Sequence, residues 1–146
     1  IAAYKSLDLI RALQREGAKA VHVLLTPSAT QFVTPTSLQM LSGHPVWQHE
    51  LQLDATSNPV HITLAQQADV LLIHPATANT LAKLAYGLAD NLVTTTACTF
   101  TNKPMVIVPA MNTRMWEHPA TQQNVALLRA WPNTVVMEPT EGLLAC

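Results

Sequence analysis

Charged residues are scarce in this chain of 146 residues, at 12% of the sequence, and the formal net charge is only −1. The chain therefore lacks the basic stripe that neutralises a phosphate backbone, which argues against nucleic acid as a partner. Long apolar runs are also missing. None of them approaches the roughly 20 residues that a helix needs to span a bilayer, so a membrane is not expected as a partner either.

Glycine and cysteine are scarce as well, with four glycines and two cysteines. No glycine-rich nucleotide-binding motif is visible. Cys98 and Cys146 form no CxxC pair and are too few for a disulfide scaffold, which fits a reducing cytoplasm. We interpret Cys98 as a small buried hydrophobic residue. His44 and His49 are five residues apart, a spacing that does not place two ligands on one helical face, so no metal site is expected.

Apolar residues, in contrast, make up 49% of the chain, enough for the core of one domain. Short runs rich in Val, Ile and Leu indicate strands covered on both faces, at 20–25, 69–73, 105–108 and 134–137. Helical patterns occupy the residues before Gly17 and the ranges 36–43, 62–68, 78–89 and 120–131. This alternation predicts an α/β fold: a three-layer, Rossmann-like (flavodoxin-like) parallel sheet with helices on both faces.

Each predicted strand is followed by a proline one or two residues past its last apolar position, in LLTPSAT, LLIHPATANT, VIVPAMN and VVMEPTEG. Proline has no N–H to donate and so ends a ladder. In a parallel sheet these ends share one edge, outside which open α/β sheets bind ligands. Each proline alone is also consistent with an ordinary strand stop. Four of them together favour a shared site.

The segments after the strands carry two unusual groups of residues. Hydroxyl residues follow the first two proline-terminated strands, where they could hold a phosphate together with helix N-terminal amides, or simply cap helices. The segment PAMNTRMW (109–116) reads as neither a common turn nor a plausible helix start, and we interpret it as one wall of the pocket. Its Met111, Met115 and Trp116 are expected to pack in the core.

Several motifs occur in one order along the whole chain: IAAYKS, HITLAQQADVLLIHPATANTLAKLAYGLADNL, PAMNTRMW followed by PATQQN, and GLLAC. Together they resemble the flavin-dependent cysteine decarboxylases. The resemblance implies FMN as cofactor, phosphopantothenoylcysteine as substrate, a homotrimer or an assembly of trimers, and a synthetase domain that is either fused or separate. Family members extend beyond both end motifs, and the first predicted helix has no strand before it. Residues 1–146 are therefore expected to be a single domain clipped at both ends.

The resemblance also implies residue roles. FMN would be bound by Thr26, Pro27, Ser28, Thr77, Ala78, Asn79, Thr80 and Ala110. The catalytic base would be His61, the substrate carboxylate would be held by Asn112, a flap would begin with Leu143, Leu144 and Ala145, and the late proton donor would be Cys146.

The implied chemistry explains these residue types. A carboxylate leaves a saturated carbon only when its electron pair has an acceptor, and oxidation of the thiol-bearing carbon to a thioaldehyde provides one. After CO2 departs, the ene-thiolate regains a hydride and a proton to give phosphopantetheine. The cycle needs a base, for which histidine suits neutral pH, a carboxylate clamp, which an asparagine amide provides without a full charge, and an acid.

From the residues alone, other interpretations stay open. His61 could be a capping or surface residue, Asn112 could form an Asx turn, and Cys146 could pack as a small apolar residue. Two other functions also remain. One is a peptidyl-cysteine decarboxylase of bacteriocin maturation, which needs no final reduction and hence no acid at Cys146. The other is a flavin-binding regulator that has lost the chemistry.

Overall fold

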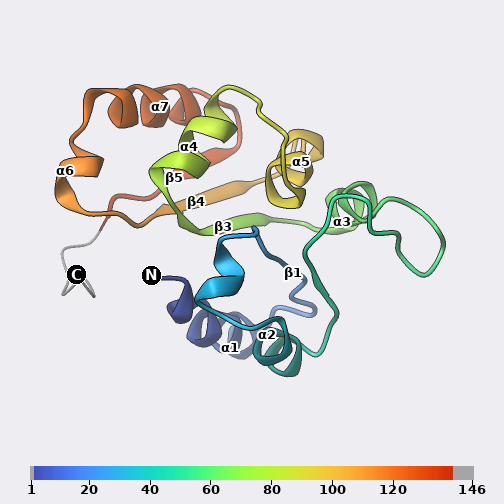
Figure 1. Cartoon of the computed structure of the whole chain (residues 1–146). Helices are drawn as coiled ribbons and strands as arrows, with labels where there is room; N and C mark the ends of the chain where they lie inside the picture. The colour runs from blue at the N-terminus through green and yellow to red at the C-terminus, as the bar shows by residue number, and fades with distance from the viewer. Residues whose placement is uncertain (1, 140–146) are drawn as a thin grey trace.

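The computed structural model describes residues 2–139, in which strands and helices alternate (Figure 1). The strands are β1 (Val23–Leu24), β2 (Val46–Trp47), β3 (Leu71–Ala76), β4 (Met105–Pro109) and β5 (Thr134–Val136). The helices are α1 (Ser6–Arg15), α2 (Pro35–Ser42), α3 (Val60–Gln67), α4 (Ala78–Ala85), α5 (Leu92–Thr99), α6 (Thr113–Trp116) and α7 (Pro119–Arg129), with short 3-10 helices η1 (Ala2–Lys5) and η2 (Ala29–Gln31).

All strand pairings in this part of the chain are parallel. β1 pairs with β2, while β3, β4 and β5 form a second sheet in that order. The register of β3 on β4 shifts between Ile73 and Ala76, so that Ala76 pairs with Pro109. The ladder therefore continues past Pro75 instead of ending before it, because the shift removes the need for a proline N–H.

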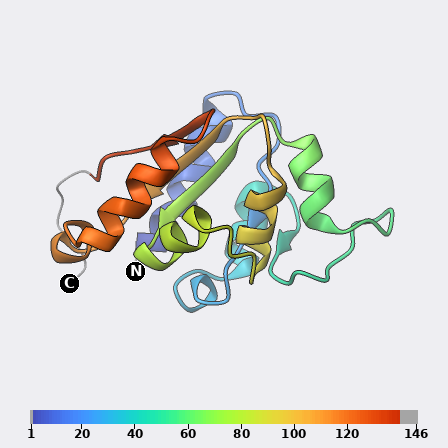
Figure 2. The same cartoon turned by 90° about the horizontal axis from the view of Figure 1, so that it is seen from above.

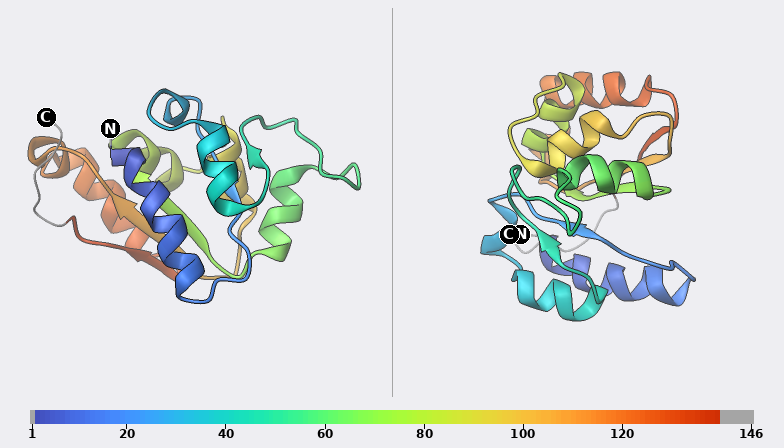
Figure 3. Two further views of the ribbon diagram at one scale, coloured as in Figure 1. Left: turned by 90° about the horizontal axis from the view of Figure 1, so that it is seen from below. Right: turned by 90° about the vertical axis from the view of Figure 1, so that its right-hand side faces the viewer.

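Helices cover both sides of the strands. In Figure 3 (right), α4, α5 and α7 lie above the β3–β4–β5 sheet, and α1 and α2 lie below, beside β1. This arrangement confirms the predicted Rossmann-like α/β fold. Within residues 2–139, no helix is long and apolar enough to cross a membrane.

Two hydrophobic clusters hold these layers together. The larger one joins the β3–β5 sheet to α4, α5 and α7, with Leu81, Ile107 and Leu128 fully buried at its centre. The smaller one joins α1 and α2 to β1 and β2 through Ile10, Leu25 and Leu38 and their neighbours. Full burial of a leucine or isoleucine side chain stabilises the fold by about 1.5–3 kcal/mol, so these clusters are the main source of stability.

Helix α4 is shorter than predicted. It ends at Ala85 rather than at residue 89, because Gly87 adopts a positive φ of 67° that leaves the helical region. Leu88, which the periodicity places on the buried face, is consequently exposed.

Helix α5 is absent from the predicted elements. Its sequence, LVTTTACT, is rich in β-branched residues and so does not read as helical. A capping box made by Asn91 and Thr94 starts the helix, and the buried Thr96 hydroxyl is satisfied because it donates to the Leu92 carbonyl at 2.7 Å. Cys98 on this helix is an exposed free thiol, so the prediction of a buried Cys98 is wrong.

Candidate functional site

The carboxyl ends of the strands gather the predicted cofactor segments along one edge. The turn after β1 (blue), the start of α4 (yellow-green) and α6 (orange) all lie along this edge in Figure 2. The ends of β3 and β4 are directly joined, since the Ala110 N–H donates to the Ala76 carbonyl at 2.9 Å. The predicted residues 77–80 and Ala110 are therefore neighbours in space.

The segment after β3 forms the N-terminus of α4. The Thr77 hydroxyl oxygen accepts from the Thr80 N–H at 3.2 Å, and the two hydroxyls lie 3.1 Å apart. Thr77 is thus a helix cap, the alternative that the sequence left open. Asn79 and Thr77 are exposed, so polar groups of this turn face outward beside the first amides of α4.

The segment after β1 forms a tight turn. Thr26 Oγ1 accepts from the Ala29 N–H at 3.3 Å, which leaves its own proton available to a ligand. Ser28 is exposed and its side chain makes no capping bond to η2. The Thr30 hydroxyl, in contrast, donates to the Pro27 carbonyl at 2.8 Å.

The donor set of these two turns fits the phosphorylated cofactor that the resemblance implies. Two hydroxyl protons, an asparagine amide and the first amides of an eight-residue helix all favour an anion. Small residues line the adjoining strand ends, where Ala76 is fully buried and Ala110 is half-buried. The residues present are therefore compatible with FMN.

Asn112 follows β4 and begins α6. Its Oδ1 accepts from the Met115 N–H at 2.9 Å, so the segment PAMNTRMW does start a helix, contrary to the prediction. Asn112 is exposed, and both protons of its amide nitrogen remain available for a carboxylate. Met111 and Trp116 pack against the larger core as predicted, whereas Met115 is exposed.

His61 lies elsewhere in the molecule. It occupies the first turn of α3, not the residues before the helix, and α3 and α6 lie at opposite ends of the structure in Figures 1 and 2. A single copy thus brings the segments after β1, β3 and β4 to one edge but does not bring His61 to Asn112.

The segment around His61 has features of a functional surface. Three buried polar atoms have no hydrogen-bond partner within residues 2–139, namely Trp47 Nε1, Glu50 Oε1 and His61 Nδ1. Such atoms are rare in native structures and call for an explanation. Large apolar side chains are exposed in the same stretch, with Leu51 at 94% and Leu53 at 55% exposure. Such exposed apolar side chains are typical of a surface that another molecule covers.

Asp54 anchors the loop that leads to His61, although the sequence assigns it no role. Its Oδ1 accepts from the Thr56 and Asn58 N–H groups at 2.8 and 3.0 Å. Its Oδ2 accepts from the Thr63 hydroxyl, which ties the loop to the first turn of α3. The α3 N-cap, Pro59, offers no capping side chain, so Asp54 serves the helix start in its place. The pattern Asp-x-Thr-x-Asn is the local signal for such a turn.

We expect Asp54→Asn to lower Tm by a few degrees at neutral pH, because the amide nitrogen cannot accept a hydrogen bond from the Thr63 hydroxyl. Hydrogen bonds from Thr63, Thr56 and Asn58 hold the pKa of Asp54 far below its ordinary value of about 3.9. The carboxylate's contribution is complete above about pH 4 and is lost as the pH falls through the lowered pKa. Thermal unfolding at pH 7 and at lower pH should show the two proteins converging on acidification. A difference that stays constant with pH would contradict this, and the exposed Asp69 provides the control Asp69→Asn.

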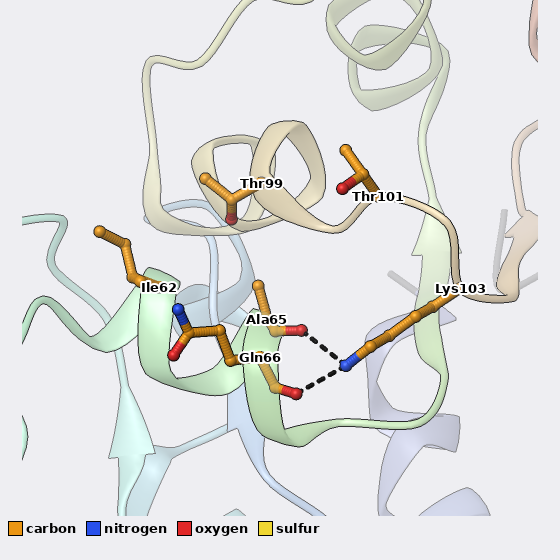
Figure 4. Close-up of a pocket in the computed structure, with 6 residues that line it drawn as sticks. All are labelled: Ile62, Ala65, Gln66, Thr99, Thr101 and Lys103. Carbon is orange, nitrogen blue, oxygen red and sulfur yellow. Dashed lines mark hydrogen bonds between the residues drawn. The ribbon is translucent and has the colours of Figure 1, made fainter.

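A separate cavity of about 500 Å³ lies between α3 and α5 (Figure 4). Lys103 enters it, but its ammonium group donates to the carbonyls of Ala65, Gln66 and Ala68 at 3.1, 2.6 and 2.8 Å. All three ammonium protons are thus used at the C-terminus of α3, so the lysine stabilises the helix instead of binding an anion. None of the predicted site residues lines this cavity.

The remaining predicted site residues, Leu143, Leu144, Ala145 and Cys146, lie outside the described residues.

Comparisons with protein-family models and with related sequences point to the same family. The protein-family model named Flavoprotein matches residues 1–146. A probable phosphopantothenoylcysteine decarboxylase from Streptococcus mutans is 46% identical over 147 residues, which cover 100% of this chain and 81% of the relative. The coenzyme A biosynthesis bifunctional protein CoaBC of Haemophilus influenzae is 42% identical, with coverage of 100% of this chain and 36% of the relative. The chain thus spans only about a third of that bifunctional relative.

Solved structures agree with this result. The FMN-dependent cysteine decarboxylase SpaF superposes with a TM-score of 0.89 at 34% identity, over 97% of this chain and 80% of SpaF. A cysteine-to-serine mutant of PPC decarboxylase, complexed with pantothenoylaminoethenethiol, superposes with a TM-score of 0.86 at 33% identity, over 99% of this chain and 79% of that protein.

Proposed function

The chain belongs to the Flavoprotein family, and from this membership we propose that it is an FMN-dependent carboxy-lyase of coenzyme A biosynthesis. Its reaction is the decarboxylation of 4′-phosphopantothenoylcysteine to 4′-phosphopantetheine, as in a phosphopantothenoylcysteine decarboxylase. The observation that carries this proposal is the 46% identity to the Streptococcus mutans relative over the whole chain. Residues 1–146 form a single flavoprotein decarboxylase domain in this proposal.

FMN binds at the carboxyl edge of the strands. The hydroxyls of Thr26 and Ser28, the Asn79 amide and the N-terminal amides of α4 hold its polar groups, and Thr77 and Thr80 shape that helix start. The remaining predicted residues, Pro27, Ala78 and Ala110, contribute backbone and small apolar surface. When bound, FMN supplies the two-electron oxidation of the thiol-bearing carbon and later returns the hydride.

The chain's own residues handle the proton transfers and hold the carboxylate. His61 removes the proton of the substrate thiol, and the Asn112 amide nitrogen donates to the carboxylate that leaves. Because the amide carries no full charge, it orients the carboxylate without stabilising it against departure. Leu143, Leu144 and Ala145 cover the substrate, and Cys146 donates the last proton.

A homotrimer, or an assembly of trimers, resolves the separation of His61 from Asn112, since His61 of one copy can complete the site of its neighbour. The exposed Leu51 and Leu53 beside α3 support this proposal, because they give the second copy an apolar surface to cover.

The whole protein has a synthetase domain fused to it or acts beside a separate synthetase, and it works in the cytoplasm. The CoaBC relative supports the former, and the exposed free thiol of Cys98 fits a reducing compartment.

A second candidate is a peptidyl-cysteine decarboxylase, favoured by the TM-score of 0.89 to the cysteine decarboxylase SpaF. Such an enzyme stops at the oxidised ene-thiol product. The presence of Cys146 as an acid favours the proposal above, since only the coenzyme A reaction needs the final reduction.

We expect the purified protein to bind FMN and to convert phosphopantothenoylcysteine into phosphopantetheine under anaerobic conditions. Mass spectrometry of the products is the measurement, with a C-terminal cysteine peptide as the comparison substrate. A product two hydrogens lighter than the saturated aminoethanethiol amide, formed from the peptide only, would favour the second candidate. FMN binding without any turnover of either substrate would indicate the non-catalytic regulator.

A further inference from the structure

His74 stands where strand β3 meets the flavin segment. Leu71 and Ile73 of this strand point into the larger core, so the alternation of side chains places His74 on the opposite face, toward α1. There the half-buried imidazole contacts Ser6, the first residue of α1. The Ser6 hydroxyl lies 2.9 Å from His74 Nδ1 and 3.3 Å from the His74 carbonyl oxygen.

This contact joins two parts of the candidate cofactor site. Within residues 2–139, the hydrogen bonds that connect residues 2–47 with residues 60–139 are the two between Ser6 and His74. The turn carrying Thr26 and Ser28 belongs to the first part, and the turn carrying Thr77 and Thr80 belongs to the second. This contact, between residues 68 apart in sequence, therefore helps to fix the relative position of the two turns.

The chemistry of the pair suits a fixed contact. Burial lowers the pKa of His74, and the nearby Lys5 ammonium lowers it further, so that the imidazole is neutral at neutral pH. A neutral ring offers Nδ1 as acceptor to the Ser6 hydroxyl, or as donor in the other tautomer, and both forms keep the contact. Three residues after His74, Thr77 begins the cap of α4.

We propose that His74 is a positioning residue for FMN, which through Ser6 sets the turn after β1 and the start of α4 at the spacing that the cofactor requires. This role rests on the proposed FMN binding. It assigns no contact between His74 and the flavin itself.

The test measures the Kd for FMN by fluorescence titration in the full chain. We expect His74→Ala and Ser6→Ala each to raise Kd about five- to tenfold, the effect of losing one partly buried hydrogen bond. The Kd of the double variant for FMN should be no higher than that of either single variant, because both substitutions remove the same contact. His74→Asn keeps a polar atom at the position of Nδ1 and should restore affinity close to that of the original protein.

Two controls keep the outcomes distinct. His49→Ala removes an exposed imidazole of the same size and should leave Kd unchanged. Ser6→Ala removes only one hydroxyl and tests the contact if His74→Ala fails to fold. Equal Kd values in all variants, or equal losses in His74→Ala and His74→Asn, would overturn the role of His74. If the original protein itself does not bind FMN, the proposed function fails and this role fails with it.

Discussion

His61→Asn is expected to slow flavin reduction by substrate at least about 100-fold while FMN stays bound. General acid–base catalysis contributes about 10²- to 10⁴-fold, and an asparagine amide cannot take up the proton of the substrate thiol. FMN should stay bound because none of the residues proposed to hold it lies on α3, the helix that carries His61. The measurement is the anaerobic loss of the visible absorbance of oxidised flavin on mixing with substrate.

The same variant tests whether active sites are shared between copies. Mixed oligomers of His61→Asn and Asn112→Leu chains should regain part of the activity that each variant lacks alone, because some sites then combine an intact His61 with an intact Asn112. His49→Asn, at an exposed histidine, is the matched control. Unchanged flavin reduction in His61→Asn would remove His61 from the mechanism. Absence of rescue in verified mixed oligomers would place both residues in one copy, against the separation of α3 and α6.

The sheet could be predicted from the sequence where strands are long enough to show a pattern. The runs at 69–73, 105–108 and 134–137 correspond to β3, β4 and β5, whose core residues are mainly Leu, Ile, Val and Met. β2 has two residues and offers no periodicity at all. α5 could not be predicted because its β-branched residues disfavour a helix in a propensity argument. Such an argument does not anticipate that the buried Thr96 hydroxyl is satisfied by a carbonyl of the helix itself.

The part of the candidate site at the strand ends could also be predicted, because its segments follow the strands that the sequence shows. Parallel strands place the segments after β3 and β4 on one edge, and the hydrogen bond from the Ala110 N–H to the Ala76 carbonyl confirms that they are neighbours. The position of α3 relative to that edge depends on how the helix packs against α5, which local sequence does not encode. The contact of Ser6 with His74 spans 68 residues and leaves no local pattern either.

The second large effect concerns Cys146, which lies outside the described residues. An unperturbed thiol has a pKa of about 8.5 and is mostly protonated at neutral pH, so that it can serve as an acid. A serine hydroxyl is a far weaker acid. Under the proposed function, Cys146→Ser should therefore still oxidise and decarboxylate the substrate, because these steps need only His61, Asn112 and bound FMN.

The variant should then stall at the ene-thiolate. We expect CO2 release without phosphopantetheine, and a product two hydrogens lighter should accumulate and be visible in the product mass spectrum. The cysteine-to-serine mutant of PPC decarboxylase, which is complexed with pantothenoylaminoethenethiol, agrees with such a product for that protein. Cys98→Ser is the matched control, since this exposed thiol lies on α5 and the proposed cycle does not use it. If Cys146→Ser makes phosphopantetheine at a near-normal rate, Cys146 is a small packing residue. Another group must then supply the last proton, because the hydride can return to carbon only when a proton arrives with it.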